Sequence, residues 1–138
     1  MQEFFYGLIR RSDVVVRTLI VFVGGGIGSV LRYLVSGWVY SILGAGFPYG
    51  TFAVNVAGSF VIGLFLAVSS DRFLIAPELR AFVAIGILGG FTTFSTFTYE
   101  TLELFKDGAY FTGGMNVLVS VATALTAAWL GNLLGKII

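Results

Sequence analysis

The sequence predicts an all-α integral membrane protein with four transmembrane helices, the third of them broken in mid-membrane. Of its 138 residues, 57% are hydrophobic and only 11% are charged. An ordinary soluble domain carries about 25% charged residues, so this chain has too few charges to cover a surface in water. Its uncharged stretches are also long enough for the helices of about 20 apolar residues that cross a bilayer.

Charges and turn residues divide the chain into four apolar segments. The uncharged stretch Tyr33–Ser70 is too long for one span and contains a glycine- and proline-rich turn at residues 44–50. Pro77 suits the first position of a helix, and residues 106–108, Lys-Asp-Gly, close the third span. We expect a single transmembrane domain over residues 1–138, with helices at about 14–43, 50–69, 77–106 and 111–137.

The composition excludes several classes of function. The chain has no cysteine and no histidine, which excludes disulfides, metal sites built on thiolate or imidazole, and the commonest general base of enzymes. Only Glu100 and Glu103 bring a carboxylate near a hydrophobic segment. We therefore expect no enzymatic activity. The net charge of +1 and the absence of a basic patch also argue against nucleic acid as a partner.

Glycine spacing predicts close helix contacts. Among the 19 glycines, three pairs are four residues apart, namely Gly24/Gly28, Gly86/Gly90 and Gly131/Gly135. In lipid, such pairs let helices approach closely, either inside one small bundle or between subunits. Four short helices enclose little volume for a polar path, and this favours an oligomer.

The positive charges favour one orientation in the membrane. With four spans, both ends of the chain and the loop after the second helix lie on one side. Six of the basic residues fall on that side and two on the other, which places the ends in the cytoplasm. The six are Arg10, Arg11, Arg17, Arg72, Arg80 and Lys136, and the two are Lys106 and Arg32.

The segment Gly89–Glu100 is the most unusual part of the chain. Two adjacent glycines and a cluster of hydroxyls interrupt an apolar stretch, and irregular backbone at membrane depth is tolerated only where protein buries it or a wet cavity adjoins it. If the helix breaks after the glycines, one half ends in free carbonyls that suit a small cation. The other half begins with free N–H groups that suit an anion.

Polar side chains on other helices suggest a path beside this break. Thr51 lies one turn before Asn55, so the two share a face, and together they favour a pore lining over a simple interhelical hydrogen bond. Phe94 and Phe97 also share a face, and their ring edges carry positive potential that attracts a small anion. The alternative for the two phenylalanines is a purely structural role, in which they pack in the core or face lipid.

Three further polar features lie in or near the predicted helices. Glu100 sits where it can hold nearby hydroxyls in place by accepting hydrogen bonds. Asn116, Ser120 and Thr123 form a polar stripe on the fourth helix. Arg32, towards the end of the first helix, either extends to the interface or draws anions into a vestibule.

These residues resemble a known family. The motif Gly-Gly-x-Thr-Thr-Phe-Ser-Thr-Phe at residues 89–97, followed by Glu100, is similar to the signature of the CrcB/Fluc fluoride channels. Gly-Thr-x-x-x-Asn at residues 50–55 and Gly-Ser-x-x-Arg at residues 28–32 agree with it. The resemblance covers nearly the whole chain after about the first dozen residues.

The resemblance implies a fluoride-selective channel of the cell membrane, working passively as an antiparallel dimer with two pores and relieving fluoride toxicity. The implied pore-lining residues are Asn55, Phe94 and Phe97. The implied polar track consists of Thr51, Ser95, Thr96, Asn116 and Ser120, with Glu100 alongside and Arg32 in the vestibule. The implied central cation is a structural sodium ion held by the backbone carbonyls of Gly89 and Thr92.

Two questions stay open in the sequence. The uneven count of basic residues leaves a heterodimer with an oppositely oriented relative as an alternative to the homodimer, although Arg17 and Arg80 lie inside predicted helices and carry less weight. A proton-coupled drug or cation transporter of four helices is the alternative function, but it needs a membrane-embedded carboxylate, typically in the first helix, and that helix has none after Asp13. A non-transporting assembly protein would leave the 89–98 cluster unexplained.

Overall fold

The computed structural model describes residues 14–71 and 75–138, and every described element is helical. The first span is α2 (Val14–Leu43) and the second is α3 (Tyr49–Asp71). The last span is α7 (Tyr110–Ile137). The third span consists of four successive pieces, α4 (Pro77–Arg80), the π-helix η1 (Ala81–Leu88), α5 (Gly89–Phe91) and α6 (Phe94–Lys106). Arg10, Arg11 and Arg72 of the orientation count lie outside the described residues.

The four-span prediction is confirmed. Four helices are long and apolar enough to cross a membrane, and their bounds lie within two residues of the predicted ones. Pro77 opens the third span as expected. Two glycines, Gly44 and Gly108, have a φ of +76° where helices end, a backbone conformation that side chains other than glycine rarely adopt. The chain is a multi-pass membrane protein.

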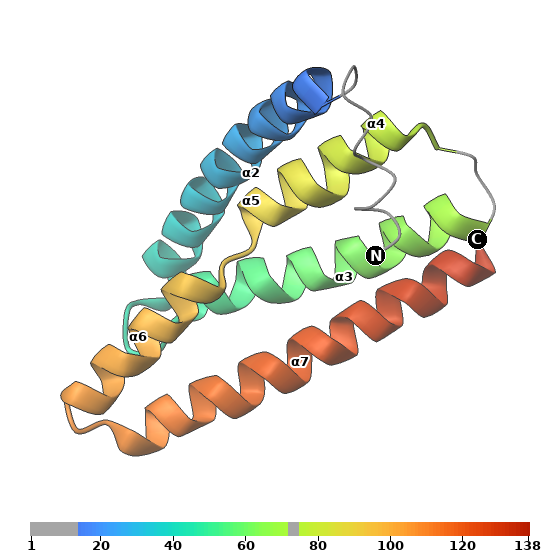
Figure 1. Ribbon diagram of the computed structural model, residues 1–138. Coiled ribbons are helices and arrows are strands. Elements are labelled where there is room, and N and C mark those ends of the chain that lie inside the picture. Colours follow the sequence, from blue (N-terminus) through green and yellow to red (C-terminus); the bar gives the residue numbers. More distant parts are fainter. Residues whose placement is uncertain (1–13, 72–74) are drawn as a thin grey trace.

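The helices pack as two close pairs. Figure 1 shows α2 beside the first half of the third span and α3 beside α7 along their length. Glycines make both contacts close. A Cβ added to Gly24 would lie 2.7 Å from the carbonyl oxygen of Phe82 and 3.0 Å from the Cα of Gly86. In the other pair, a Cβ on Gly131 would collide with the backbone of Phe60. The spaced glycines therefore serve packing inside the subunit.

The third span is interrupted after Phe91. Thr92 has φ −84° and ψ 157°, Thr93 has φ −150° and ψ 119°, and helix resumes at Phe94. Gly89 and Gly90 are helical, so the interruption falls just after the two glycines, within the segment that the sequence singled out. The π-helix over Ala81–Leu88 has no counterpart in the sequence predictions, because hydropathy does not distinguish it from an α-helix.

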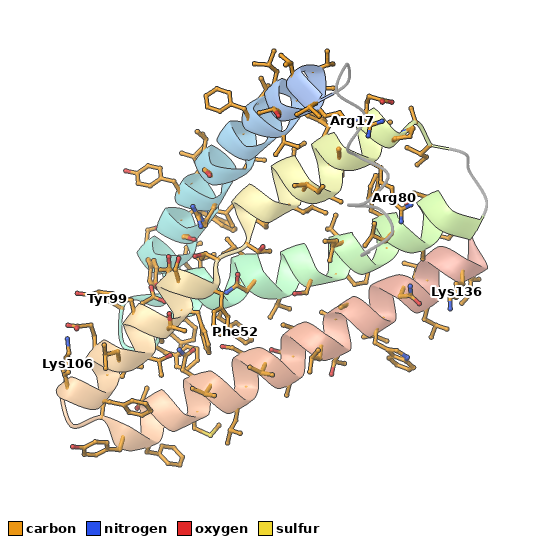
Figure 2. The ribbon with its side chains drawn as sticks, viewed as in Figure 1. Arg17, Phe52, Arg80, Tyr99, Lys106 and Lys136 are labelled. Carbon is orange, nitrogen blue, oxygen red and sulfur yellow. The ribbon has the colours of Figure 1, made fainter. Side chains whose placement is uncertain are left out.

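Among the basic side chains of the described residues, Arg32 reaches the interruption of the third span and the other four lie toward the ends of the bundle. In Figure 2, Lys106 lies where α6 turns into α7, and Arg17, Arg80 and Lys136 lie toward the opposite end. Arg17 Nη2 is 3.3 Å from Glu78 Oε1, an ion pair that joins the start of α2 to α4. Large apolar side chains cover the exterior between the ends, such as Phe22, which is 76% exposed. Such an exterior is stable in hydrocarbon and not in water.

Candidate functional site

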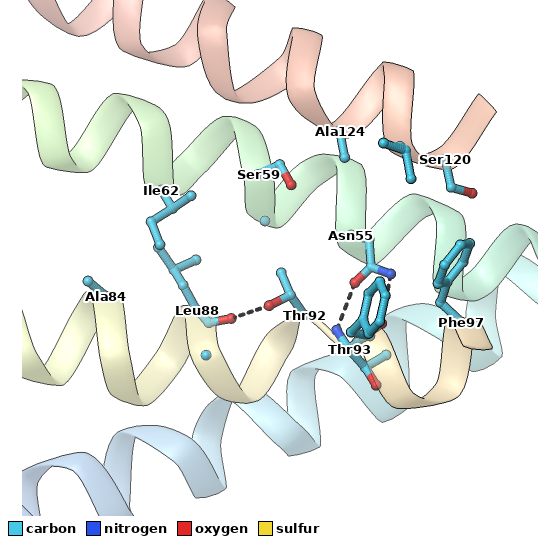
Figure 3. A pocket seen from close by; sticks show the side chains of 14 residues that line it. Asn55, Ser59, Ile62, Ala84, Leu88, Thr92, Thr93, Phe97, Ser120 and Ala124 are labelled. Carbon is cyan, nitrogen blue, oxygen red and sulfur yellow. Dashed lines mark hydrogen bonds between the residues drawn. The ribbon is translucent and has the colours of Figure 1, made fainter. Parts of the chain in front are cut away.

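A cavity of about 310 Å³ lies at the interruption of the third span, between α3, the third span and α7. Figure 3 shows its lining from close by. It brings together six of the residues singled out from the sequence, which are Asn55, Gly89, Thr92, Phe94, Phe97 and Ser120. The others do not line it, and they are Thr51, Ser95, Thr96, Glu100, Asn116, Thr123 and Arg32. Ser59, Ile62, Leu88, Val121 and Ala124 supply apolar or weakly polar walls.

Asn55 holds the backbone of the interruption from the neighbouring helix. Its Oδ1 accepts a hydrogen bond from the Thr93 N–H at 2.7 Å, and its Nδ2 donates to the Thr93 carbonyl at 2.9 Å. Figure 3 shows the amide facing Thr93. A carboxamide has two N–H donors, so one N–H of Asn55 remains for another acceptor. The side chain therefore combines an interhelical contact with a spare donor at the cavity.

Thr93 also starts the next helix. Its Oγ1 accepts from the Thr96 N–H at 3.2 Å, the N-cap bond of α6, and its hydroxyl donates to Thr96 Oγ1 at 3.0 Å. Ser95 Oγ lies 3.3 Å from the same hydroxyl. The hydroxyl cluster predicted as part of a polar track thus gathers around the first turn of α6.

Two carbonyl oxygens at the interruption, those of Gly89 and Thr92, lack the N–H donor that a continuing helix would give them. In an α-helix the N–H of residue 93 would bond to the carbonyl of Gly89, but the Thr93 N–H is turned to Asn55. The Thr92 carbonyl receives only a long contact from Arg32 Nη1, at 3.5 Å. Carbonyl oxygens are suitable ligands for hard cations. Within residues 14–71 and 75–138, no group of acidic side chains could hold a metal, so a cation here would depend on backbone oxygens.

The two phenylalanines adjoin each other but differ in exposure. Their ring centroids are 5.5 Å apart at an interplanar angle of 42°. Phe97 is only 7% exposed, whereas Phe94 is 74% exposed. Both border the cavity, so Phe97 forms an inner wall and Phe94 an exposed outer edge.

A chain of buried hydrogen bonds joins α7 to α6 behind Phe97. The Ser120 hydroxyl donates to Asn116 Oδ1 at 3.1 Å, and Asn116 Nδ2 donates to Thr101 Oγ1 at 2.8 Å. The Thr101 hydroxyl donates to the Phe97 carbonyl at 2.7 Å. Asn116 is 1% exposed and Thr101 is 6% exposed. These hydrogen bonds fix the positions of Phe97 and Ser120 on opposite walls of the cavity.

Glu100 lies at a second cavity, of about 400 Å³, near the turn between α2 and α3. Its Oε1 accepts from the Tyr40 hydroxyl at 2.8 Å. Its Oε2 is buried and has no hydrogen-bond partner among the described residues. Thr51 is 3% exposed and lines neither cavity. Glu100 therefore lies away from the first cavity, on the side where Tyr40 holds it.

Three contributors to the site were not singled out from the sequence, and they are Thr93 as a cap, Tyr40 and Thr101. A signal existed for Thr93, because a threonine directly before a helical segment is a frequent N-cap. Tyr40 and Thr101 are ordinary helix residues whose partners come from other helices. No local pattern marks such residues.

Fold and site together define a multi-pass membrane protein with a mainly apolar cavity, carrying a few polar groups, beside an interrupted helix. A family model described as "CrcB-like protein, Camphor Resistance (CrcB)" matches residues 19–132, and the chain belongs to this family. A relative from Geotalea daltonii is 51% identical over 114 residues, covering 81% of this chain and 92% of its own. One from Geobacter metallireducens is 53% identical over 107 residues, covering 78% and 86%. Both relatives are named fluoride-specific ion channel FluC.

Proposed function

We propose that this protein is a fluoride-selective channel through which cytoplasmic fluoride leaves the cell passively. The observation that carries the proposal is the set of groups at the first cavity. Asn55, Phe94, Phe97 and Ser120 converge there, in a family whose relatives are named fluoride-specific channels. Asn55, Phe94 and Phe97 lie in the motifs that resemble the channel family, and Ser120 is a position that the resemblance implies for its polar track.

The cavity lining supplies what a dehydrated fluoride ion needs. Removing a small anion from water is costly unless N–H, O–H or other positive groups replace the lost hydration. Asn55 offers its second N–H and Ser120 lies on the facing wall. The rings of Phe94 and Phe97 have positive edges, which attract an anion without a full charge that would trap it. Binding is thus strong enough for entry and weak enough for exit.

The remaining proposed residues extend this path. The hydroxyls of Thr51, Ser95, Thr96 and Ser120, the amide of Asn116 and the carboxylate of Glu100 form the proposed polar track. Arg32 supplies positive potential near its mouth. Buried donors such as Asn116 hold neighbouring hydroxyls in place, and no step requires a chemical reaction or a nucleotide.

The driving force comes from acid–base chemistry and membrane potential. Hydrogen fluoride crosses membranes as a neutral molecule and dissociates in the less acidic cytoplasm, where fluoride is trapped as an anion. A membrane potential that is negative inside favours outward movement of an anion by about 2.3 kcal/mol per 100 mV. A passive selective pore in the cell membrane is therefore sufficient to relieve fluoride toxicity.

The working unit of the proposal is an antiparallel dimer with two pores. Phe94, although it borders the cavity, is 74% exposed in one subunit, so the path gains its missing wall from a second copy. Arg17, Arg80 and Lys136 lie at one end of the bundle and Lys106 at the other. That asymmetry keeps pairing with an oppositely oriented relative as the alternative to a homodimer.

The proposed sodium ion would be held by the carbonyls of Gly89 and Thr92 from both subunits. When bound, it supplies positive charge that satisfies backbone oxygens left without helical donors. The diversion of the Thr93 N–H to Asn55 supports this assignment, because it leaves the Gly89 carbonyl without its helical donor. Its expected role is structural.

Fluoride efflux from liposomes tests the proposal directly. Purified protein is reconstituted into vesicles loaded with potassium fluoride, valinomycin is added, and external fluoride is read with an electrode. We expect rapid efflux that requires valinomycin and is insensitive to a proton gradient, with no comparable chloride release. Efflux that instead follows the proton gradient would favour the alternative, a proton-coupled transporter. No fluoride release at all would refute the channel.

A further inference from the structure

We propose that Asn55 is a positioning residue for the cation site as well as a donor in the pore. By holding the Thr93 peptide, it prevents the third span from closing a helical turn on the Gly89 carbonyl. A single side chain would then connect the fluoride path to the sodium site. This inference rests on the proposed function, because it concerns how that channel keeps its cation ligands available.

The hydrogen bonds show where the helix is diverted. The Thr92 N–H still bonds to the Leu88 carbonyl at 3.1 Å, the ordinary helical partner four residues back. The next N–H in line, that of Thr93, would bond to Gly89 in a continuing helix. It bonds instead to Asn55 Oδ1 at 2.7 Å. The helix therefore ends at the residue whose N–H Asn55 captures.

Asn55 is suited to this role because it satisfies both polar groups of Thr93. Thr93 is 8% exposed, so an unpaired N–H or carbonyl there would be costly. A carboxamide accepts and donates at once, and here it does both, at 2.7 and 2.9 Å. One turn further along α3, Gly58 leaves room for Thr92, because a Cβ there would collide with Thr92 Cγ2. Together they seat the extended residues against α3.

The consequence is a freed carbonyl beside a spare donor. With Thr93 turned away, the Gly89 carbonyl has lost its helical N–H and keeps its lone pairs for a cation. Gly89 itself has open surroundings, since a Cβ there would find its nearest neighbour, the Ala84 carbonyl oxygen, at 3.9 Å. The second N–H of Asn55 stays available to an anion in the cavity.

Two substitutions at Asn55 separate the roles. In Asn55→Asp one carboxylate oxygen still accepts from the Thr93 N–H, so the Gly89 carbonyl stays free. The bond to the Thr93 carbonyl is lost, and both that carbonyl and fluoride now meet an acceptor. In Asn55→Ala the Thr93 N–H is released and can return to Gly89. Val56→Ala is the matched control, since Val56 is the next residue on α3 and does not line the cavity. This substitution removes side-chain volume but leaves both hydrogen bonds between Asn55 and Thr93 in place.

The readout is the sodium dependence of dimer stability, measured on the full chain in detergent. The fraction of dimer surviving heating is followed by size exclusion over a sodium series, with N-methyl-D-glucamine keeping the ionic strength constant. We expect wild type, Val56→Ala and Asn55→Asp to share a sodium midpoint or Asn55→Asp to have a lower one. We expect Asn55→Ala to need about tenfold more sodium, the effect of losing roughly 1.4 kcal/mol of cation binding. Both Asn55 variants should lose fluoride efflux.

The outcomes distinguish this inference from the proposed function. Equal sodium midpoints for Asn55→Asp and Asn55→Ala would overturn the inference and leave the channel standing. A wild-type dimer indifferent to sodium would remove the sodium site and this inference with it, whereas efflux would still test the channel. If Asn55→Ala forms no dimer at any sodium concentration, dimer formation by Asn55→Asp supports the inference that Asn55 holds the Thr93 peptide away from Gly89. Failure of Asn55→Asp as well would refute it.

Discussion

Replacing Thr101 with valine removes the centre of the buried hydrogen-bond chain that joins α6 to α7. Valine has nearly the shape of threonine, so packing is kept and only the hydroxyl is lost. The Thr101 hydroxyl accepts from Asn116 Nδ2 at 2.8 Å and donates to the Phe97 carbonyl at 2.7 Å. The substitution therefore tests how much this chain contributes to holding the cavity wall.

The cost follows from burial. The Phe97 carbonyl lies inside α6 and keeps its helical N–H partner, so losing the Thr101 hydroxyl as a second donor costs it little. Asn116 is 1% exposed, and its N–H would be left without a partner or water. A buried donor left unsatisfied costs about 1–3 kcal/mol. We expect Thr101→Val to lower the free energy of unfolding by about 2 kcal/mol on that basis.

A double-mutant cycle isolates the hydrogen bond from the packing. Asn116→Leu removes the amide at similar volume, and Ser120 can then donate to a carbonyl of its own helix. The double variant has no stranded polar group, so we expect it to be more stable than the sum of the single effects by at least about 1 kcal/mol. Unfolding in mixed micelles of increasing SDS content provides the free energies.

Additive effects of the two substitutions would refute this account, because they would mean that water or a rearranged side chain already satisfies Asn116. Efflux from the same proteins addresses function separately. Since Asn116 is one of the proposed fluoride-path residues, we expect the stable double variant to conduct poorly. Full conduction would restrict Asn116 to a structural role.

Three further predictions concern the aromatic pair, the adjacent glycines and the tyrosine at the second cavity. Phe94→Ile and Phe97→Ile should each lower fluoride efflux about fivefold, the value of roughly 1 kcal/mol of ring-edge attraction, while the protein still assembles; unchanged efflux would make them packing residues. Gly89→Leu should reduce the dimer fraction without harming the subunit, whereas Gly90→Ala should destabilise the subunit itself, since its Cβ would lie 2.5 Å from a backbone oxygen of α2. Tyr40→Phe should lower the unfolding free energy by about 1–3 kcal/mol by stranding a buried carboxylate oxygen; an unchanged value would mean that water reaches it.

The helices could be predicted closely because local chemistry determines them. Uncharged length determined the spans, and Pro77, Gly44 and Gly108 mark their ends through backbone preferences of single residues. The sequence also placed the interruption just after the two glycines, but it could not show which residues are extended, because that depends on a tertiary contact. The two glycines stay helical, and the extended residues are Thr92 and Thr93, where Asn55 of another helix takes the backbone.

The candidate site likewise has features that the sequence predicts and features that depend on contacts between helices. That Phe94 and Phe97 adjoin follows from helical spacing, but their exposures of 74% and 7% depend on where α7 lies. Tyr40 and Thr101 could not be found from the sequence, since each partners a residue at least 15 positions away and the register between helices sets the pairing. Periodicity shows which face a residue occupies and not which helix covers that face.

The division of contacts in this bundle explains how a cavity with polar groups persists in it. Glycines draw α2 onto the first half of the third span and α3 onto α7, so each pair packs without space. Hydrogen bonds from Asn55 and Asn116 join the α3–α7 pair to Thr93 in the interruption and to α6. Apolar contacts alone would favour closing the cavity, because a void forfeits dispersion contacts. Directional bonds instead fix where the interruption and α6 lie against α3 and α7, and the second N–H of Asn55 stays available at the cavity.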